Sequence, residues 1–383
     1  MKLCESGVKP RPITTRLNPP MPRFATLLSL VSLGVLWNTA CPAHLIGDRA
    51  HDGQPSHYDP KATPPARLVF AAAAASPGNA TSRAALLAAV FRPFAPQVKT
   101  RADDRFFYVE SDGLPAHRMM VGITAWQQQV PWPQSYLGDN AWRFPLRPVP
   151  AANPLSARTR FFRGAIALAA NGVPIFNPIK NDGRTDTFLA GELDEFGGHA
   201  GRADDYHYHL APLHLQPLVG SNQPVAFALD GYPIHGLAEP DGTPAGKLDA
   251  FNGHTTATSG YHYHATKTYP YLNGGFHGEV VERDGQVDPQ PRAQGVREAT
   301  TPLPGARITG FTRPTTNRYA LTYQVGGETR RVNYQLQPNG AAQFDYVDGQ
   351  GRVESKTYEP RPRPPGGRGG RPPTDAPRRP VQP

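Results

Sequence analysis

The stretch that decides the fold is DDYHYHLAP, residues 204–212. Its four-residue core, Tyr-His-Tyr-His, returns in SGYHYHATK at residues 259–267. In a β-strand, residues i and i+2 point to the same face of the sheet. His207 and His209 therefore share one face of a predicted strand, with Cα atoms about 6.5–7 Å apart. Two imidazoles at this spacing can converge on one metal ion.

The surrounding residues repeat as well. Residues 193–209 align with residues 248–264 at a constant offset of 55, with the pattern L-D-x-F-x-G-H-x6-Y-H-Y-H. Upstream, residues 165–178 align with residues 224–237 at an offset of 59, around a shared Asn/Asp-Gly-x-Pro-Ile turn. We call residues 165–209 the first segment and residues 224–264 the second segment. The sequence of each segment predicts a strand, a turn, a loop and a Tyr-His-Tyr-His strand. The two segments are expected to pack with pseudo-two-fold symmetry.

Further histidines lie near each motif. His199 and His254 each precede the second motif histidine by ten residues and follow a glycine, where a loop could fold a third nitrogen back. His235 has Phe176 as its counterpart, so the two sites need not be equal. Neutral imidazole suits Zn, Cu and Fe. We therefore predict a divalent transition metal (Cu, Zn or Fe) held by histidines from this set: His207, His209, His262, His264, His199, His254 and His235.

The arrangement leaves alternatives open. The ligands could form two mononuclear sites or one site shared across the pseudo-two-fold. A Tyr/His strand could also stack aromatic rings across a sheet with no metal at all. Asp194 and Asp249 could be ligands, but they are expected instead to fix histidine tautomers or to shape loop turns. Asp204 and Asp205 have no counterpart in the second segment and are expected on a loop surface. The motif tyrosines are expected beside the site, packed in the core with their hydroxyls bonded: Tyr206, Tyr208, Tyr261 and Tyr263.

The duplicated motif resembles the bacterial YHYH-domain family. The resemblance rests on YHYH itself, on DGYPIHG at residues 230–236, on YPYLNGGFHG at residues 269–278 and on SDGLPAH at residues 111–117. It covers about residues 106–278. The family is largely uncharacterised in function, so the resemblance implies a domain and no particular reaction.

The remaining sequence predicts a mainly β protein. Apolar and β-branched runs end at turn dipeptides throughout the body, and Gly326-Gly327 predicts a hairpin between alternating strands. The fold class expected is an internally duplicated, β-rich YHYH domain with many loops, followed by a small antiparallel β meander. The expected boundaries are 1–43 for an export signal, 44–96 for a linker with a short helix near 81–94, 97–290 for the YHYH domain, 305–360 for the meander and 361–383 for a disordered basic tail.

Charge and cysteine content restrict the function classes. Residues 1–23 carry +4 and residues 361–383 carry +5, which equals the whole net charge of +9. The body is formally neutral, so no nucleic-acid partner is expected. The two cysteines, Cys4 and Cys41, lie in or next to the export segment, so any metal in the body is held by nitrogen and oxygen.

The N-terminal sequence predicts export. Arg23 precedes an apolar run from Phe24 to Trp37 and then small residues, which is typical of a signal peptide and too short to cross a bilayer. A secreted or periplasmic protein is expected, with an envelope or extracellular partner, and with a lipoprotein anchored through Cys41 as the lesser alternative.

Three function classes fit these observations. The first is an exported metal-binding protein. The second is a metal-dependent enzyme, a copper or iron oxidoreductase or a zinc hydrolase, with Asp194, Asp230 or Asp249 as acid or base. The third is a scaffold or carbohydrate-binding module. Its sugar-stacking candidates are Trp126, Trp132, Trp142 and Tyr136, although core packing is the favoured interpretation of these aromatics.

Overall fold

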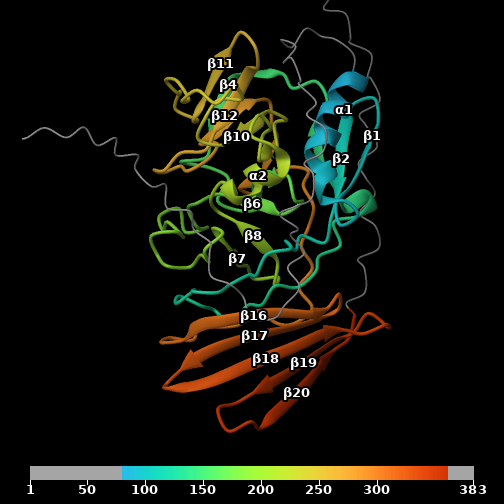
Figure 1. The fold of residues 1–383 in the computed structure, drawn as a ribbon, viewed down its shortest axis with the longest axis vertical. Coiled ribbons are helices and arrows are strands. Elements are labelled where there is room, and N and C mark those ends of the chain that lie inside the picture. The colour runs from blue at the N-terminus through green and yellow to red at the C-terminus, as the bar shows by residue number, and fades with distance from the viewer. Residues whose placement is uncertain (1–79, 361–383) are drawn as a thin grey trace, which may run out of the picture. The chain divides into compact units, whose positions relative to one another are not determined.

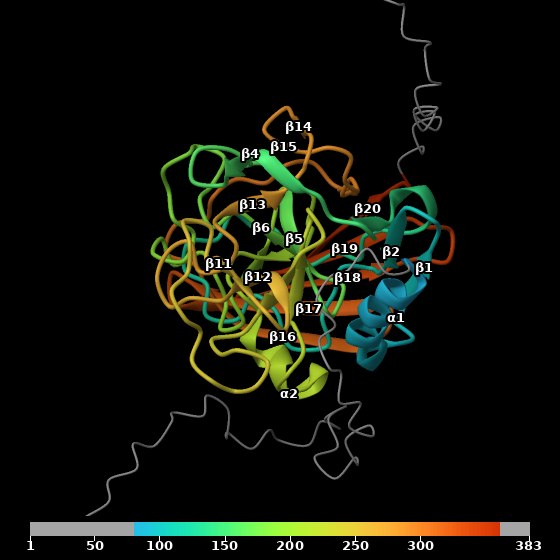
Figure 2. The ribbon, with the colours of Figure 1, turned by 90° about the horizontal axis from the view of Figure 1, so that it is seen from above.

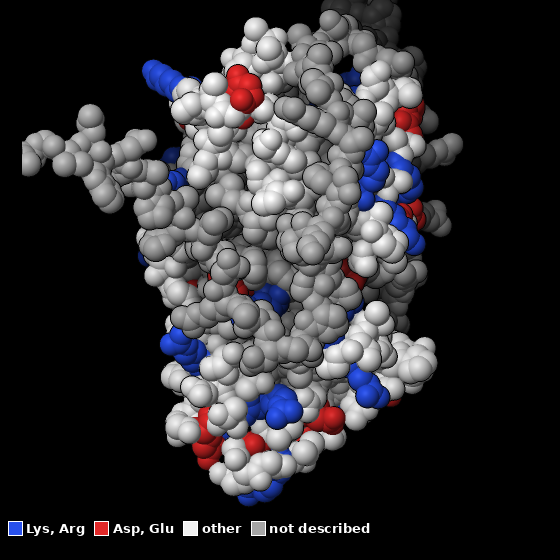
Figure 3. Space-filling view, viewed as in Figure 1, with Lys and Arg blue, Asp and Glu red and all other residues white. Residues whose placement is uncertain are grey.

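The computed structural model describes residues 80–360. All described residues belong to a single unit of the chain. The predicted export segment, Cys41 and the predicted basic tail lie outside the described residues. Within the described part, none of the helices is long and apolar enough to cross a membrane. On the face shown in Figure 3, lysines and arginines are mixed with acidic side chains.

An eight-stranded sheet forms the centre of the described unit (Figure 1). Its strands lie in the order β11-β12-β10-β9-β5-β6-β8-β7. The mainly β fold class is thus confirmed. The strands are β5 (Ala165–Ala169), β6 (Pro174–Phe176), β7 (Gly198–Ala200), β8 (Tyr206–Tyr208), β9 (Ala226–Ala228), β10 (Pro233–His235), β11 (Gly253–Thr256) and β12 (Gly260–His264).

The middle of this sheet has the register of a two-fold axis. Strands β5 and β9 are antiparallel, and Leu168 lies opposite Phe227, its counterpart at the offset of 59. Ala167 pairs with Ala228, and Ala169 pairs with Ala226. Each strand therefore meets the equivalent of itself. All residues of both strands are buried, as expected for strands covered on two faces.

The two motif strands lie near opposite ends of the sheet. In the first segment, β8 pairs in parallel with β6 and antiparallel with β7. In the second segment, β12 pairs in parallel with β10 and antiparallel with β11. The expected loop positions of His199 and His254 are wrong, because both residues lie on strands. The β7–β8 and β11–β12 ladders place them directly opposite His207 and His262.

Helix α1 (Ala80–Phe91) belongs to the folded body. It leads into η1 (Arg92–Phe94) and lies beside β1 (Lys99–Ala102) and β2 (Phe106–Glu110) (Figure 2). The ring of Phe91 stacks on Phe107, on Phe144 of β3 (Trp142–Pro145) and on Phe227. These contacts tie residues that were expected at the end of a linker to the core of the sheet.

The remaining short elements connect and cover the sheet. Strand β4 (Pro150–Ser156) pairs with β13 (Gly275–Gly278), and β14 (Glu282–Arg283) pairs with β15 (Gln286–Val287). The helical turns are η2 (Gly138–Asn140), η3 (Leu213–Leu215) and α2 (Gln216–Val219).

A five-stranded antiparallel meander ends the described chain. It consists of β16 (Arg307–Thr315), β17 (Arg318–Val325), β18 (Glu328–Leu336), β19 (Ala342–Val347) and β20 (Val353–Tyr358). Gly326 and Gly327, both at positive φ, form the hairpin turn that the sequence predicts.

The tryptophans expected as sugar-stacking candidates are buried. Trp126 packs against Tyr323 of the meander, and Trp132 stacks on Phe344. Trp142 and Tyr136 contact each other, and each is 2% exposed. The carbohydrate interpretation is therefore wrong for these four residues, which form the core and the contact with the meander.

A buried ion pair holds the segment before the meander. The Arg297 guanidinium donates to both carboxylate oxygens of Asp204 at 2.7 and 2.8 Å, and also to the carbonyl of Gln128. Asp204 also accepts a hydrogen bond from Val130 N–H. The expected surface position of Asp204 and Asp205 is wrong: they are 3% and 5% exposed. Asp204 has no counterpart in the second segment, and its partner, Arg297, comes from outside both segments.

Removing one partner of this pair tests its role. In Arg297→Met the Asp204 carboxylate stays buried without its main donor, and we expect the free energy of unfolding to fall by about 3–5 kcal/mol. Chemical denaturation of the full chain measures the loss. Arg283→Met is the matched control, because Arg283 is exposed and its pair with Asp288 should contribute below about 1 kcal/mol. Equal losses in the two variants would contradict this account.

Candidate metal centres

The alternation of the motif strands places histidines and tyrosines on opposite faces. His207 and His209 extend to one side of β8, where they meet His199 from β7. His262 and His264 do the same on β12 and meet His254 from β11. We call the first group, His199, His207 and His209, cluster one. The second group, His254, His262, His264 and Glu239, is cluster two.

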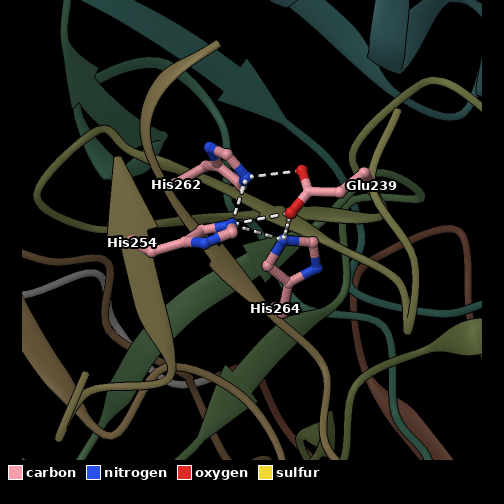
Figure 4. Close-up of side chains that lie close together, drawn as sticks. All are labelled: Glu239, His254, His262 and His264. Atoms are coloured by element: carbon pink, nitrogen blue, oxygen red, sulfur yellow. Dashed lines mark hydrogen bonds and ion pairs between the residues drawn. The ribbon is translucent and has the colours of Figure 1, made fainter. Parts of the chain in front are cut away.

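Cluster two brings four potential metal ligands together (Figure 4). The Nε2 atom of His254 lies 3.1 Å from that of His262 and 3.2 Å from that of His264. Glu239, from the turn after β10, completes the group. Its Oε1 lies 2.8 Å from His254 Nε2, and its Oε2 lies 3.1 Å from His262 Nε2. His262 and His264 are fully buried, and burial lowers the pKa of His264.

Cluster one has three histidines in the same arrangement. The Nε2 atoms of His199 and His209 are 3.1 Å apart, and one ligand atom from each of the three histidines lies within 4.8 Å of the others. Burial lowers the pKa of His199 and His209 well below the usual range, and neighbouring imidazoles lower it further. Phe176 stacks on His207 at a ring distance of 3.9 Å. The two clusters are separate groups, so the histidines do not converge on one shared site.

Backbone carbonyls fix the orientation of the motif imidazoles. His209 Nδ1 lies 2.7 Å from Asn177 O, and His264 Nδ1 lies 3.0 Å from Gly236 O, its counterpart. His207 and His262 direct Nδ1 to the carbonyls of Asp205 and Gly260. Because a carbonyl oxygen only accepts, each Nδ1 carries a proton, and Nε2 is the ring nitrogen left to bind a metal ion.

The predicted role of Asp194 and Asp249 in fixing histidine tautomers is wrong. Both shape loop turns, as the sequence also allowed. Asp194 accepts hydrogen bonds from the N–H groups of Phe196 and Gly198 and from the Tyr206 hydroxyl. Asp249 accepts from the corresponding groups of the second segment, including the Tyr261 hydroxyl. Burial raises the pKa of Asp194 to about 6.

The motif tyrosines bond away from the imidazole clusters. Tyr263 donates to Asp230, whose pKa burial raises to about 6, and accepts from the N–H of His277. Tyr208 lies within hydrogen-bond distance of His117, His214 and Asn171. Since the strand separates these hydroxyls from the Nε2 atoms, the tyrosines support the fold on the opposite face. Asp194, Asp230 and Asp249 share that face, so none is placed as an acid or base beside the clusters.

His235 lies next to cluster two and outside it. Its ring is 5.3 Å from that of His262 and 6.0 Å from that of His264, and it is absent from the group of converging ligand atoms. Its predicted ligand role is therefore not supported by the geometry, and Glu239 occupies the fourth position. Glu239 was missed by the sequence reasoning. One feature of the sequence could have identified Glu239. The repeat offset of 59 aligns Glu239 with Lys180, so the two segments carry opposite charges at this position.

Residues 141–243 match the model of the family described as YHYH protein. The chain contains a YHYH domain. The matched range includes cluster one and Glu239 and ends before β11 and β12, which carry the histidines of cluster two. No curated protein matches the chain, and no solved structure matches it.

Acid should weaken the fold through buried neutral histidines. Burial lowers the pKa of His235 to about 3, of His214 to about 3 and of His117 to about 4. The unfolded chain binds these protons near pH 6.5 and the folded chain does not, so stability falls as pH decreases below 6.5. Asp194 and Asp230 have the opposite effect. Burial raises the pKa of both to about 6, so the folded chain binds their protons first and these two groups add stability as the pH falls from about 6 to 4.

The variant His235→Phe isolates one such group, since Phe176 is the natural residue at the equivalent position. Between pH 7 and pH 5 the metal-free variant should lose less stability than the parent, by up to about 2 kcal/mol. Denaturation of the full chain at both pH values measures this difference. Identical pH dependence in parent and variant would show that His235 does not remain neutral in the fold.

Proposed function

We propose that this YHYH-domain protein is an exported metal-binding protein, and that each segment holds one divalent transition ion. The two segments are, on this proposal, copies of one metal-binding unit. Cluster two is a closed site of three imidazoles and one carboxylate. Export rests on the sequence of residues 21–43 alone, and any envelope or extracellular partner is part of the same proposal.

The convergence of acceptors in cluster two carries the proposal. With Nδ1 of His262 and His264 donating to carbonyls, both Nε2 atoms are acceptors, and the two oxygens of Glu239 accept as well. A proton on His254 Nε2 could serve only one of these four atoms at a time. Buried acceptors without donors cost about 1–3 kcal/mol each. A cation at the centre satisfies all of them at once.

The distances suit a small transition ion. Ligands about 2.0–2.1 Å from a tetrahedral zinc ion lie about 3.3 Å from one another. Five of the separations in cluster two lie between 2.8 Å, from Glu239 to His254, and 3.4 Å, from Glu239 to His264. Imidazole and carboxylate donors are compatible with Zn, Cu and Fe, and so these three remain the candidate metals.

Metal titration of the purified, chelator-treated full chain tests the function. With Zn²⁺ or Cu²⁺, followed by elemental mass spectrometry, we expect two bound ions per chain. His262→Ala/His264→Ala should lose one ion, and His207→Ala/His209→Ala the other. Glu239→Gln should weaken metal binding at cluster two about tenfold or more, because this cluster loses its only anionic ligand.

His235→Phe serves as the matched control, since it changes a histidine beside cluster two that is not among the converging ligands. It should retain both ions. A folded parent that binds neither Zn²⁺ nor Cu²⁺ would refute the metal function. Loss of an ion in His235→Phe would return His235 to the ligand set.

A further inference from the structure

We propose that cluster one is an open metal site, in which a carboxylate-bearing small molecule supplies the fourth ligand and Lys180 holds it. This inference rests on the proposed metal function and deepens it for one cluster. Cluster two, by contrast, is closed by its own glutamate.

Lys180 occupies the position in the first segment that Glu239 occupies in the second. The two residues are separated by the offset of 59 and lie in equivalent turns. Lys180 N–H donates to Thr185 O and Glu239 N–H to Thr243 O, while the next glycine N–H returns to residue 180 or 239. The carbonyl that orients the last motif histidine comes three residues earlier in both segments. The position is therefore conserved in geometry and reversed in charge.

The reversal changes what cluster one can bind. Three neutral imidazoles leave a divalent ion without a compensating negative charge. A protonated lysine cannot coordinate a metal, because its ammonium group has no lone pair. It can donate to an anion that coordinates the metal. A site with three protein ligands and one open position is the arrangement of catalytic zinc centres, whereas four protein ligands are typical of structural ones.

The second segment indicates which anion fits. There a carboxylate at the fourth position approaches all three Nε2 atoms, between 2.8 and 3.4 Å. The equivalent space in cluster one would accept the same group from a separate molecule. The Lys180 side chain is 27% exposed, against 12% for Glu239, so the Lys180 side chain is the more open of the two to solvent.

Glu192 is the internal competitor for this role. Its carboxylate accepts a hydrogen bond from Lys180 Nζ at 2.7 Å. The group of atoms that converge in cluster one does not include it. An ammonium group has three donors, so Lys180 can hold Glu192 and a bound carboxylate together.

Cobalt spectroscopy of the full chain tests the inference. In this experiment the parent is the double variant His262→Ala/His264→Ala, which keeps only cluster one. It is loaded with Co²⁺ and then titrated with sodium acetate. We expect acetate to change the visible Co²⁺ spectrum with saturation. Lys180→Met should weaken acetate binding at least about tenfold, as loss of one charged hydrogen bond predicts. Lys99→Met, which removes an exposed lysine of β1, is the matched control and should respond like the parent. Should the parent fold poorly, the same titration is made on the otherwise unaltered chain.

A second variant converts the site. Lys180→Glu should reproduce cluster two, binding Co²⁺ more tightly than the parent and showing no response to acetate. Bound Co²⁺ whose spectrum ignores acetate, or an equal acetate response in Lys180→Met, would overturn the open site while leaving metal binding intact. A spectrum altered by Glu192→Gln before acetate is added would identify Glu192 as the fourth ligand and also overturn it. No Co²⁺ at cluster one would refute the metal function there.

Discussion

Both sites depend on one constraint, the two-residue period of the motif strand. Because alternate side chains leave opposite faces, the same four residues can supply two ligands and two buried hydrogen-bonding phenols. The tyrosine face is fixed by carboxylates and histidines, and the histidine face by backbone carbonyls that hold each ring through Nδ1. A shift of one residue in β8 or β12 would exchange the two faces and destroy both arrangements.

Much of this could be predicted from the sequence. The period of YHYH was enough to group His207 with His209, and His262 with His264. The repeated spacing added His199 and His254, although it placed them on loops instead of strands. The turn glycines Gly326 and Gly327 predicted the hairpin of the meander. These features are local or periodic, and local geometry determines them.

The features that could not be predicted depend on contacts between distant parts of the chain. Asp204 reads as a surface residue because its partner, Arg297, lies 93 residues away. The sequence favours core packing for Trp126 and Trp132 but does not show what covers them, because the covering strands come about 200 residues later. His235 was included among the ligands and Glu239 was missed, because residue type alone favours histidine as a transition-metal ligand. Only the fold shows that Glu239 faces the Nε2 atoms while the ring of His235 lies beside them.

The β5–β9 register has a consequence for how the two centres can differ. Interfaces in which a strand meets its own equivalent are typical of symmetric dimers. In such a dimer one gene specifies both halves, so a glutamate at the fourth position would appear at both sites. Here the two halves are parts of a single chain, joined by a continuous sheet. A charge can therefore be reversed in one half without changing the other, and the molecule can hold two dissimilar centres in one nearly symmetric frame.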